Sequence, residues 1–162
     1  MTDPSDRTAP LVWVVTDGKV GIVNQAVGLA EATGFAFIEK VIALRAPWRW
    51  LPASLWPPGL LGISADGDQL TPPWPDMVIS CGRQSIGPAR AIKAKSGAFH
   101  VHIQHPRMSL LSFDLLVVPE HDCLTGDNVV ATRGAIHRVP PARLAEAAKA
   151  FAPMLAGVLG KF

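Results

Sequence analysis

The chain has 162 residues, of which 49% are hydrophobic and 17% charged, and its formal net charge is +2. This length is typical of one domain, and so small a charge argues against a nucleic-acid partner. No uninterrupted apolar run reaches the roughly 18 residues of a membrane span, and the polar start over residues 1–9 lacks the layout of a signal peptide. Two cysteines are too few for a disulfide scaffold, so the cytoplasm is the expected compartment.

The amino-terminal part of the chain predicts a β-α-β unit that follows a flexible tail over residues 1–10. The apolar run LVWVV at residues 11–15 is typical of a strand buried on both faces. After the glycine turn TDGKVG, residues 24–33 predict a helix that ends at Gly34. Residues 35–44 predict a second strand. This order favours a parallel sheet with a right-handed crossover.

Residues 46–75 interrupt the pattern with seven prolines and four tryptophans, and only a short helix around residues 52–56 is expected there. We refer to this segment as the Trp/Pro excursion. Further strands are predicted at 76–80, 98–103, 113–118 and 128–131, with helices from Pro88 to about Lys95 and over residues 141–152. Residues 153–162 then resemble the start of a linker. Residues 11–152 therefore predict an α/β, Rossmann-like domain with a mostly parallel sheet of about six strands and helices on both faces.

A polar loop follows each predicted strand, and in a parallel sheet these loops share one edge, where ligands of open α/β sheets bind. Gly18 and Gly21 would bring backbone amides to a ligand, while Lys19, Arg83 and Arg107, together with Arg133, would meet negative charge. The candidate ligand-binding residues are Asp17, Gly18, Lys19, Gly21, Asn24, Gln25, Arg83, Ser85, Gln104 and Arg107.

Two interpretations of the first turn remain open. It binds a phosphate, carboxylate or sugar, or it needs glycine only for a tight strand-to-helix connection. Asn24 and Gln25 would likewise hydrogen-bond ligand hydroxyls or secure the start of the helix. The turn is neither a Walker A sequence nor the dinucleotide fingerprint, and no cofactor is expected.

The segment Glu120-His121-Asp122 is the candidate catalytic group, since a histidine beside carboxylates can serve as a general base. The alternative is turn chemistry, in which Asp122 caps the loop.

His100 and His102 share one strand face, where we expect packing rather than a metal site. Cys81 is expected to be a buried thiol, although a nucleophile at that strand end is the alternative.

The Trp/Pro excursion also has two interpretations. Trp48, Trp50 and Trp56, with neighbouring arginines, suit a membrane interface. Alternatively, the excursion is a lid that packs on the domain or on a partner domain.

The motifs TDGKVGIVNQAVGLAEATG, PDMVISCGRQS, VHIQHPR, FDLLVVPEHD and NVVATRGAIHRV occur in the order of the Elm-type mitochondrial fission family, which the chain resembles over residues 11–148. The family is similar to GT-B glycosyltransferases such as lipid-A-disaccharide synthase and the transferase that completes the peptidoglycan lipid precursor. In such enzymes the amino-terminal domain carries the acceptor side and often touches the membrane, and the second domain holds most nucleotide-sugar contacts. The plant member is implicated in recruiting a dynamin-related protein.

The resemblance implies that this chain is the acceptor-side half of a GT-B-like protein. Such a protein would bind a nucleotide-sugar or an anionic glycolipid-like ligand between two domains, and this half would be inactive alone. One departure is that the family turn usually reads Asp-Gly-Lys-x-Gly-His, whereas Ile22 stands at the histidine position. The competing hypothesis is a non-catalytic module that recruits a protein partner at the inner face of a membrane. A homodimer through the surface that the second half would cover is a further expectation.

Overall fold

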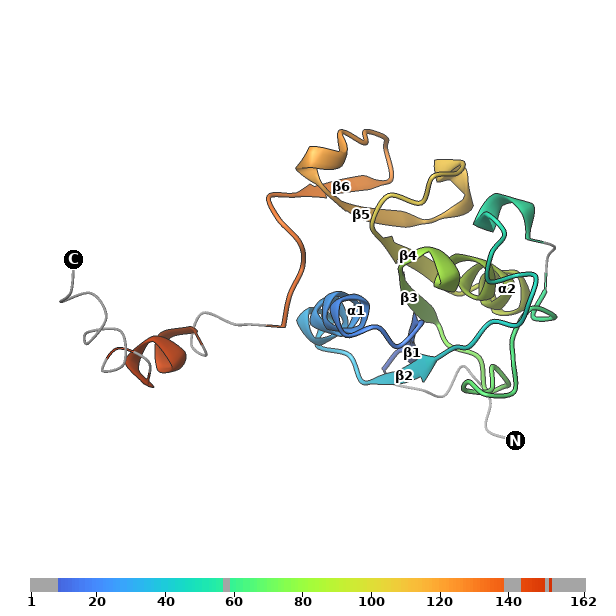
Figure 1. The fold of residues 1–162 in the computed structure, drawn as a ribbon, viewed down its shortest axis with the longest axis horizontal. Helices are drawn as coiled ribbons and strands as arrows, with labels where there is room; N and C mark the ends of the chain where they lie inside the picture. The colour runs from blue at the N-terminus through green and yellow to red at the C-terminus, as the bar shows by residue number, and fades with distance from the viewer. Residues whose placement is uncertain (1–8, 57–58, 139–143, 151, 153–162) are drawn as a thin grey trace.

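The computed structural model describes residues 9–56, 59–138, 144–150 and 152. Its centre is one sheet of six parallel strands in the order β2-β1-β3-β4-β5-β6 (Figure 1). The strands are β1 (Val12–Thr16), β2 (Phe37–Val41), β3 (Met77–Cys81), β4 (Phe99–Ile103), β5 (Leu115–Pro119) and β6 (Val129–Thr132). The predicted Rossmann-like α/β fold is confirmed, and the sheet is entirely parallel.

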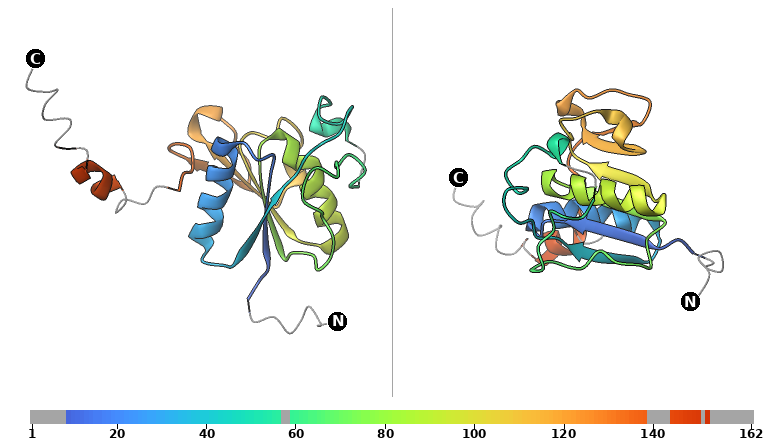
Figure 2. Two further views of the ribbon diagram at one scale, coloured as in Figure 1. Left: turned by 60° about the horizontal axis from the view of Figure 1, so that its bottom comes forward. Right: turned by 90° about the vertical axis from the view of Figure 1, so that its right-hand side faces the viewer.

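Two helices cover opposite faces of this sheet, α1 (Val20–Thr33) and α2 (Ile86–Ser96) (Figure 2). Side chains of successive strand residues point to alternate faces. Val12 and Val14 therefore pack in the cluster that contains α1, while Trp13 and Val15 pack in the cluster that contains α2. Burial on both faces explains the uninterrupted apolar run of β1.

The Trp/Pro excursion returns over the α2 face of the sheet, where Trp56 and Trp74 pack against the core. The expected short helix is a 3-10 turn, η2 (Ala53–Leu55). Three further 3-10 turns punctuate the connections: η3 (Arg83–Ser85), η4 (Leu110–Ser112) and η5 (Glu120–Asp122).

Several predicted boundaries are wrong by two residues or more, and three of them have a clear physical reason. Helix α1 begins at Val20 rather than at residue 24, because the glycine turn leads directly into it and Lys19 is its N-cap residue. Helix α2 begins at Ile86, and Pro88 is its third residue, where a missing N–H disrupts no helical hydrogen bond. Strand β2 ends at Val41, because Ile42 and Leu44 leave the sheet for the core on the α2 face.

Residues 144–150 are helical and solvent-exposed, within the helix predicted over 141–152. The predicted linker over 153–162 lies outside the described residues, as does most of the predicted flexible tail. In the part of the chain that the structure describes, no helix is long and apolar enough to cross a membrane.

Candidate functional site

The strand order places a switch point between β1 and β3, since the chain passes from β1 to β2 on one side and from β3 to β4 on the other. The loops that follow β1 and β3 flank this point. Gly82 adopts a φ of 82°, and a Cβ built on it would lie 3.2 Å from Ile22 Cδ1. Ile22 thus packs over the loop after β3, so an aliphatic side chain occupies the position at which the resemblance implied a histidine.

The turn after β1 is stabilised by its own side chains. Gly18 has a φ of 77°, and a Cβ there would come within 2.9 Å of Val41 Cγ1, so this position requires glycine for geometry. Lys19 Nζ donates to Asp17 Oδ2 at 2.6 Å, which pairs the charge of Lys19 within the turn. By contrast, Gly21 is helical and has open space above it.

The other two candidates on this helix lie nearby in its first turns, with Asn24 exposed and Gln25 half-buried. The first turn of α1 has no side-chain cap, and the amides of Ile22 and Val23 share the Lys19 carbonyl. The positive end of the helix is therefore open to solvent.

A cavity of about 350 Å³ lies where the loops after β3 and β4 meet the returning excursion. It brings together three of the predicted residues, Arg83, Gln104 and Arg107, which come from two neighbouring strand ends. The full lining is Pro52, Ala53, Arg83, Ile86, Gln104, His105, Pro106 and Arg107.

The two arginines of this cavity keep their positive charge uncompensated. Arg83 donates to the backbone carbonyls of Leu51 (3.2 Å) and Arg49 (3.0 Å), which are neutral groups. Arg107 is exposed. Across the described ranges, neither guanidinium forms an ion pair with a carboxylate. Two unpaired guanidinium groups beside one cavity suit an anionic ligand.

The loop after β4 has an unusual backbone. Gln104 and Arg107 have φ values of 85° and 52°, a left-handed conformation that costs a non-glycine residue about 1 kcal/mol. The backbone N–H of Gln104 donates to Val117 O at 2.9 Å, and the backbone N–H of Arg107 donates to His105 Nδ1 at 3.0 Å. His105 is a cavity residue that was not among the candidates. The sequence feature that could have identified His105 is a side-chain acceptor placed two residues before Arg107, the spacing found in an Asx turn.

Ser85 and Cys81 are buried in the turn after β3 rather than exposed to a ligand. Ser85 Oγ donates to the carbonyls of Cys81 and Gly82, both at 2.8 Å, so its hydroxyl holds the turn. Burial, with a further contribution from Asp17, raises the pKa of the Cys81 thiol to about 12. The expectation of a buried thiol is confirmed.

The predicted catalytic group lies outside the cavity. Glu120, His121 and Asp122 form η5 at the end of β5, with His121 Nε2 3.8 Å from Asp122 Oδ1 and the imidazole 77% exposed. Lys19 and Arg133, which were expected to face the same crevice as Arg83 and Arg107, do not line the cavity either.

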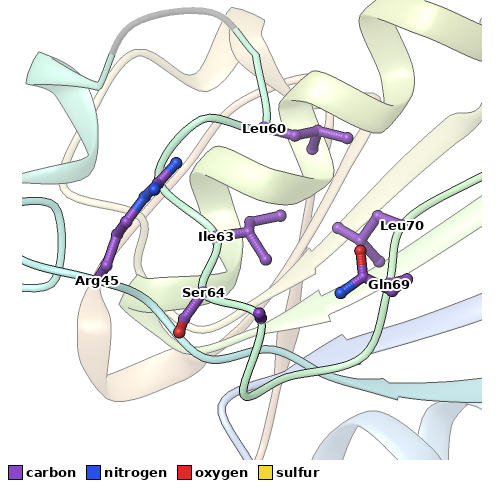
Figure 3. Close-up of a pocket in the computed structure, with 7 residues that line it drawn as sticks. Arg45, Leu60, Ile63, Ser64, Gln69 and Leu70 are labelled. Atoms are coloured by element: carbon purple, nitrogen blue, oxygen red, sulfur yellow. The ribbon is translucent and has the colours of Figure 1, made fainter.

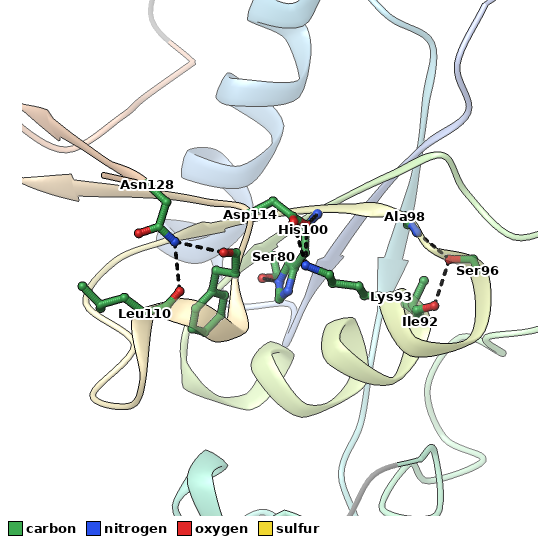
Figure 4. A network of polar contacts seen from close by, with 10 residues as sticks. Ser80, Ile92, Lys93, Ser96, Ala98, His100, Leu110, Asp114 and Asn128 are labelled. Atoms are coloured by element: carbon green, nitrogen blue, oxygen red, sulfur yellow. Dashed lines mark hydrogen bonds and ion pairs between the residues drawn. The ribbon is translucent and has the colours of Figure 1, made fainter. Parts of the chain in front are cut away.

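The two strand histidines form a buried polar cluster. Ser80 Oγ lies 2.8 Å from both His100 Nε2 and His102 Nδ1, and the ring of Phe113 packs against both imidazoles. Figure 4 shows Ser80 and His100 together with Asp114 and Lys93. Burial lowers the pKa of each histidine to about 3, so both are neutral. Asp114 accepts the His100 amide and pairs with Lys93.

The contacts of His100 and His102 are those of packed core side chains. No group of three or more metal-ligating side chains occurs in the part of the chain that the structure describes.

The excursion contains a smaller cavity of about 280 Å³, lined largely by Leu60, Ile63 and Leu70 (Figure 3). The guanidinium of Arg45, at its rim, donates to the Leu61 carbonyl. All of its lining residues belong to the connection between β2 and β3, so it is separate from the cavity at the ends of β3 and β4.

The tryptophans of the excursion differ in exposure. A Cβ on Gly87 would lie only 2.0 Å from the Trp56 ring, so Trp56 is seated directly on α2. Trp48 packs in the same way against Gly62. Trp50 is 64% exposed and lies under the Arg49 guanidinium, with 4.6 Å between the guanidinium carbon and the ring centroid.

Comparison with known proteins gives a consistent family assignment. A family model described as Mitochondrial fission ELM1 matches residues 20–160. The protein named Mitochondrial fission protein ELM1 from Arabidopsis thaliana is 36% identical over 102 residues, which cover 48% of this chain and 24% of that relative. The chain is thus similar to a minor part of a longer protein, and no solved structure matches it. The match over residues 20–160 shows that the chain belongs to the mitochondrial fission ELM1 family.

Proposed function

We propose that this chain is the acceptor-side domain of a GT-B glycosyltransferase-like protein and that it binds the phosphate portion of a nucleotide-sugar or an anionic glycolipid-like ligand. The observation that carries the proposal is the pair Arg83 and Arg107, which reach one cavity from two neighbouring strand ends and have no carboxylate partner among the described residues. Guanidinium groups bind phosphate oxygens through paired N–H donors.

The remaining lining of the cavity fits such a ligand. Gln104 offers an amide that can donate to or accept from a hydroxyl, while Ile86 and Pro106 are buried apolar residues suited to a non-polar group. The site would be one wall of an interdomain cleft. Glu120, His121 and Asp122, on the neighbouring strand end, would then act only once a second domain closes over them, and the chain alone is expected to be inactive.

The proposal is tested by thermal unfolding of the chain, and of the full-length protein, with UDP-, GDP- and CMP-sugars. One of these ligands should raise the melting temperature, because binding to the folded state alone stabilises it. Arg107→Ala should abolish the rise. Arg133→Ala is the matched control, since Arg133 is exposed at a strand end but lies outside the cavity. The absence of a shift with every nucleotide-sugar removes that class of ligand, and an equal loss in both variants contradicts binding at the cavity.

A second candidate function is a module that recruits a protein partner at a membrane surface. It is supported by a group of exposed apolar side chains on the excursion: Trp50, Leu55 and Leu61 are 64%, 66% and 69% exposed. Arg45 and Arg49 accompany them, and this combination is favourable at an anionic interface. The plant relative is a mitochondrial fission protein by name, which supports a role at a membrane.

Sedimentation with vesicles containing phosphatidylglycerol separates the two functions. The membrane module predicts binding that is lost in Trp50→Ala and retained in Val20→Ala, since Val20 is 76% exposed but lies in α1, which covers the face of the sheet opposite to the excursion. Failure of the wild-type chain to sediment with these vesicles removes the second candidate.

A further inference from the structure

The loop after β4 connects a histidine with one of the two cavity arginines, and it does so through the backbone. His105 Nδ1 accepts the amide N–H of Arg107 at 3.0 Å. A ring nitrogen accepts a hydrogen bond only when it carries no proton, so the neutral imidazole must have its proton on Nε2. The hydrogen bond thereby fixes the tautomer of His105, and Nδ1 is the ring nitrogen that bonds to the loop backbone.

Arg107 needs this support because its conformation is unfavourable by itself. Its φ of 52° lies in the left-handed region, as does the φ of 85° at Gln104. Such residues persist only where their surroundings hold them. Two other restraints act on the loop: Gln104 is tied to β5 through Val117 O, and Pro106 is buried with a ring that restricts its own φ. Neither acts directly on the amide of Arg107, whereas His105 does.

We propose that His105 is a positioning residue, which holds the backbone of Arg107 in its left-handed conformation so that the guanidinium lines the cavity. This inference rests on the proposed function, because it assumes that Arg107 binds the phosphate portion of the ligand. His105 itself need not contact that ligand. Loss of the Nδ1 acceptor lets Arg107 return to ordinary backbone conformations, in which its guanidinium is no longer directed to the cavity beside Arg83.

Three substitutions separate positioning from direct ligand contact. Asn places its carbonyl oxygen near the position of Nδ1 and forms the corresponding turn to the residue two further on, so His105→Asn keeps the bond to Arg107. Gln places its amide near Nε2, so His105→Gln keeps a donor toward the cavity and loses that bond. His105→Ala loses both. Since His105 is exposed, we expect all three variants to fold with the parent melting temperature.

Affinities for UDP and for inorganic pyrophosphate, measured by titration calorimetry, give the first test. Positioning predicts that His105→Asn stays within about twofold of the parent, while His105→Gln and His105→Ala bind about tenfold more weakly, the equivalent of one hydrogen bond. The reverse order, with Gln retaining affinity and Asn losing it, overturns positioning in favour of direct contact. Equal affinities in all variants overturn any role for His105.

A measurement without ligand keeps the inference distinct from the proposed function. In the ¹⁵N-labelled chain, the imidazole shifts should show protonated Nε2 and unprotonated Nδ1. The temperature coefficient of the Arg107 amide proton should be that of a hydrogen-bonded N–H in the parent and in His105→Asn, but that of a solvent-exposed N–H in His105→Ala and His105→Gln. An Arg107 amide that keeps its hydrogen-bonded coefficient in His105→Ala overturns the positioning role even where UDP binds the parent chain. Failure of the parent chain to bind UDP and pyrophosphate, with these shifts as expected, overturns the proposed function and leaves the loop assignment standing.

Discussion

Strand β4 and the loop after it place three histidines in two contrasting environments. His100 and His102 are buried and share the Ser80 hydroxyl, whereas His105 is exposed at the rim of a cavity and accepts a backbone N–H. The first two are neutral because burial disfavours the imidazolium form. The comparison shows that the same residue type serves the interior of this sheet as packing and its carboxyl edge as a potential part of a binding site.

The largest effect that distinguishes the two environments is the response of stability to acid. The pKa of His100 and of His102 is about 3 in the folded chain and near 6.5 when the chain is unfolded. Below pH 6.5 only the unfolded state gains these protons, so the free energy of unfolding should fall by about 1.4 kcal/mol per pH unit for each imidazole until pH 3. The stabilisation is fully present above pH 6.5.

Urea unfolding between pH 7 and pH 4 measures this loss. A free energy of unfolding that is the same at pH 7 and pH 4.5 would mean that the buried pair does not remain neutral.

The next largest effect concerns the hydroxyl that joins the buried pair. Ser80→Ala should lower the free energy of unfolding by about 2 kcal/mol, because a nitrogen of each buried ring then loses its hydrogen-bond partner. Ser54→Ala, at an exposed serine, is the matched control. A loss for Ser80→Ala that is no greater than for Ser54→Ala would contradict the role of Ser80 in the cluster.

A smaller effect on stability is expected at the turn after β1, on the carboxyl edge of the sheet, where Gly18 and Gly21 differ. Gly18→Ala should destabilise the chain by about 1–2 kcal/mol, since its φ is positive and the new methyl meets Val41. Gly21→Ala should stabilise it by about 0.5–1 kcal/mol, because Gly21 is helical with open space above it. Thermal unfolding checks both.

Ligand binding then decides whether Gly21 has a second role. A Gly21→Ala chain that is more stable but binds UDP more weakly would favour contact between the start of α1 and the ligand. Unchanged affinity would limit the binding site to the cavity after β3 and β4.

The smallest effect is expected at Lys19. Its ion pair with Asp17 is local and Lys19 is 68% exposed, so Lys19→Ala should change the free energy of unfolding by less than about 0.5 kcal/mol. Its effect on UDP affinity should be smaller than that of Arg107→Ala, because Lys19 does not line the cavity. Titration calorimetry on the two variants tests this ranking. A larger loss of UDP affinity with Lys19→Ala would place the anion site at the switch point between β1 and β3.

The strands were predictable because burial on both faces leaves a direct mark on sequence: LVWVV at β1 and the runs at β3 and β5 are almost wholly apolar. The starts of the two helices were harder to predict. Neither helix has a side-chain cap hydrogen bond, and α2 follows directly from a 3-10 turn, so the usual capping signal is absent.

The sequence predicted which edge of the sheet carries the candidate site, but it did not predict the cavity. A parallel sheet necessarily gathers the loops after β3 and β4, which is why the sequence predicted that Arg83, Gln104 and Arg107 lie close together, as they do around the cavity. The remaining wall comes from Pro52 and Ala53, whose return to this edge depends on long-range packing such as that of Trp56 on Gly87. His105 was not identified because its role depends on the backbone conformation of Arg107, which local composition does not reveal.

The hydrogen bonds of Arg83 to Leu51 and Arg49 link the cavity energetically to the excursion. A ligand that draws the guanidinium away from these two carbonyls must weaken the hold on the segment that carries Trp50. Linkage is reciprocal, so a surface that displaces this segment would change the affinity of the cavity for its ligand by the same factor. Under the two proposed functions, this one side chain would make occupancy of the cavity and engagement of the excursion thermodynamically dependent on each other.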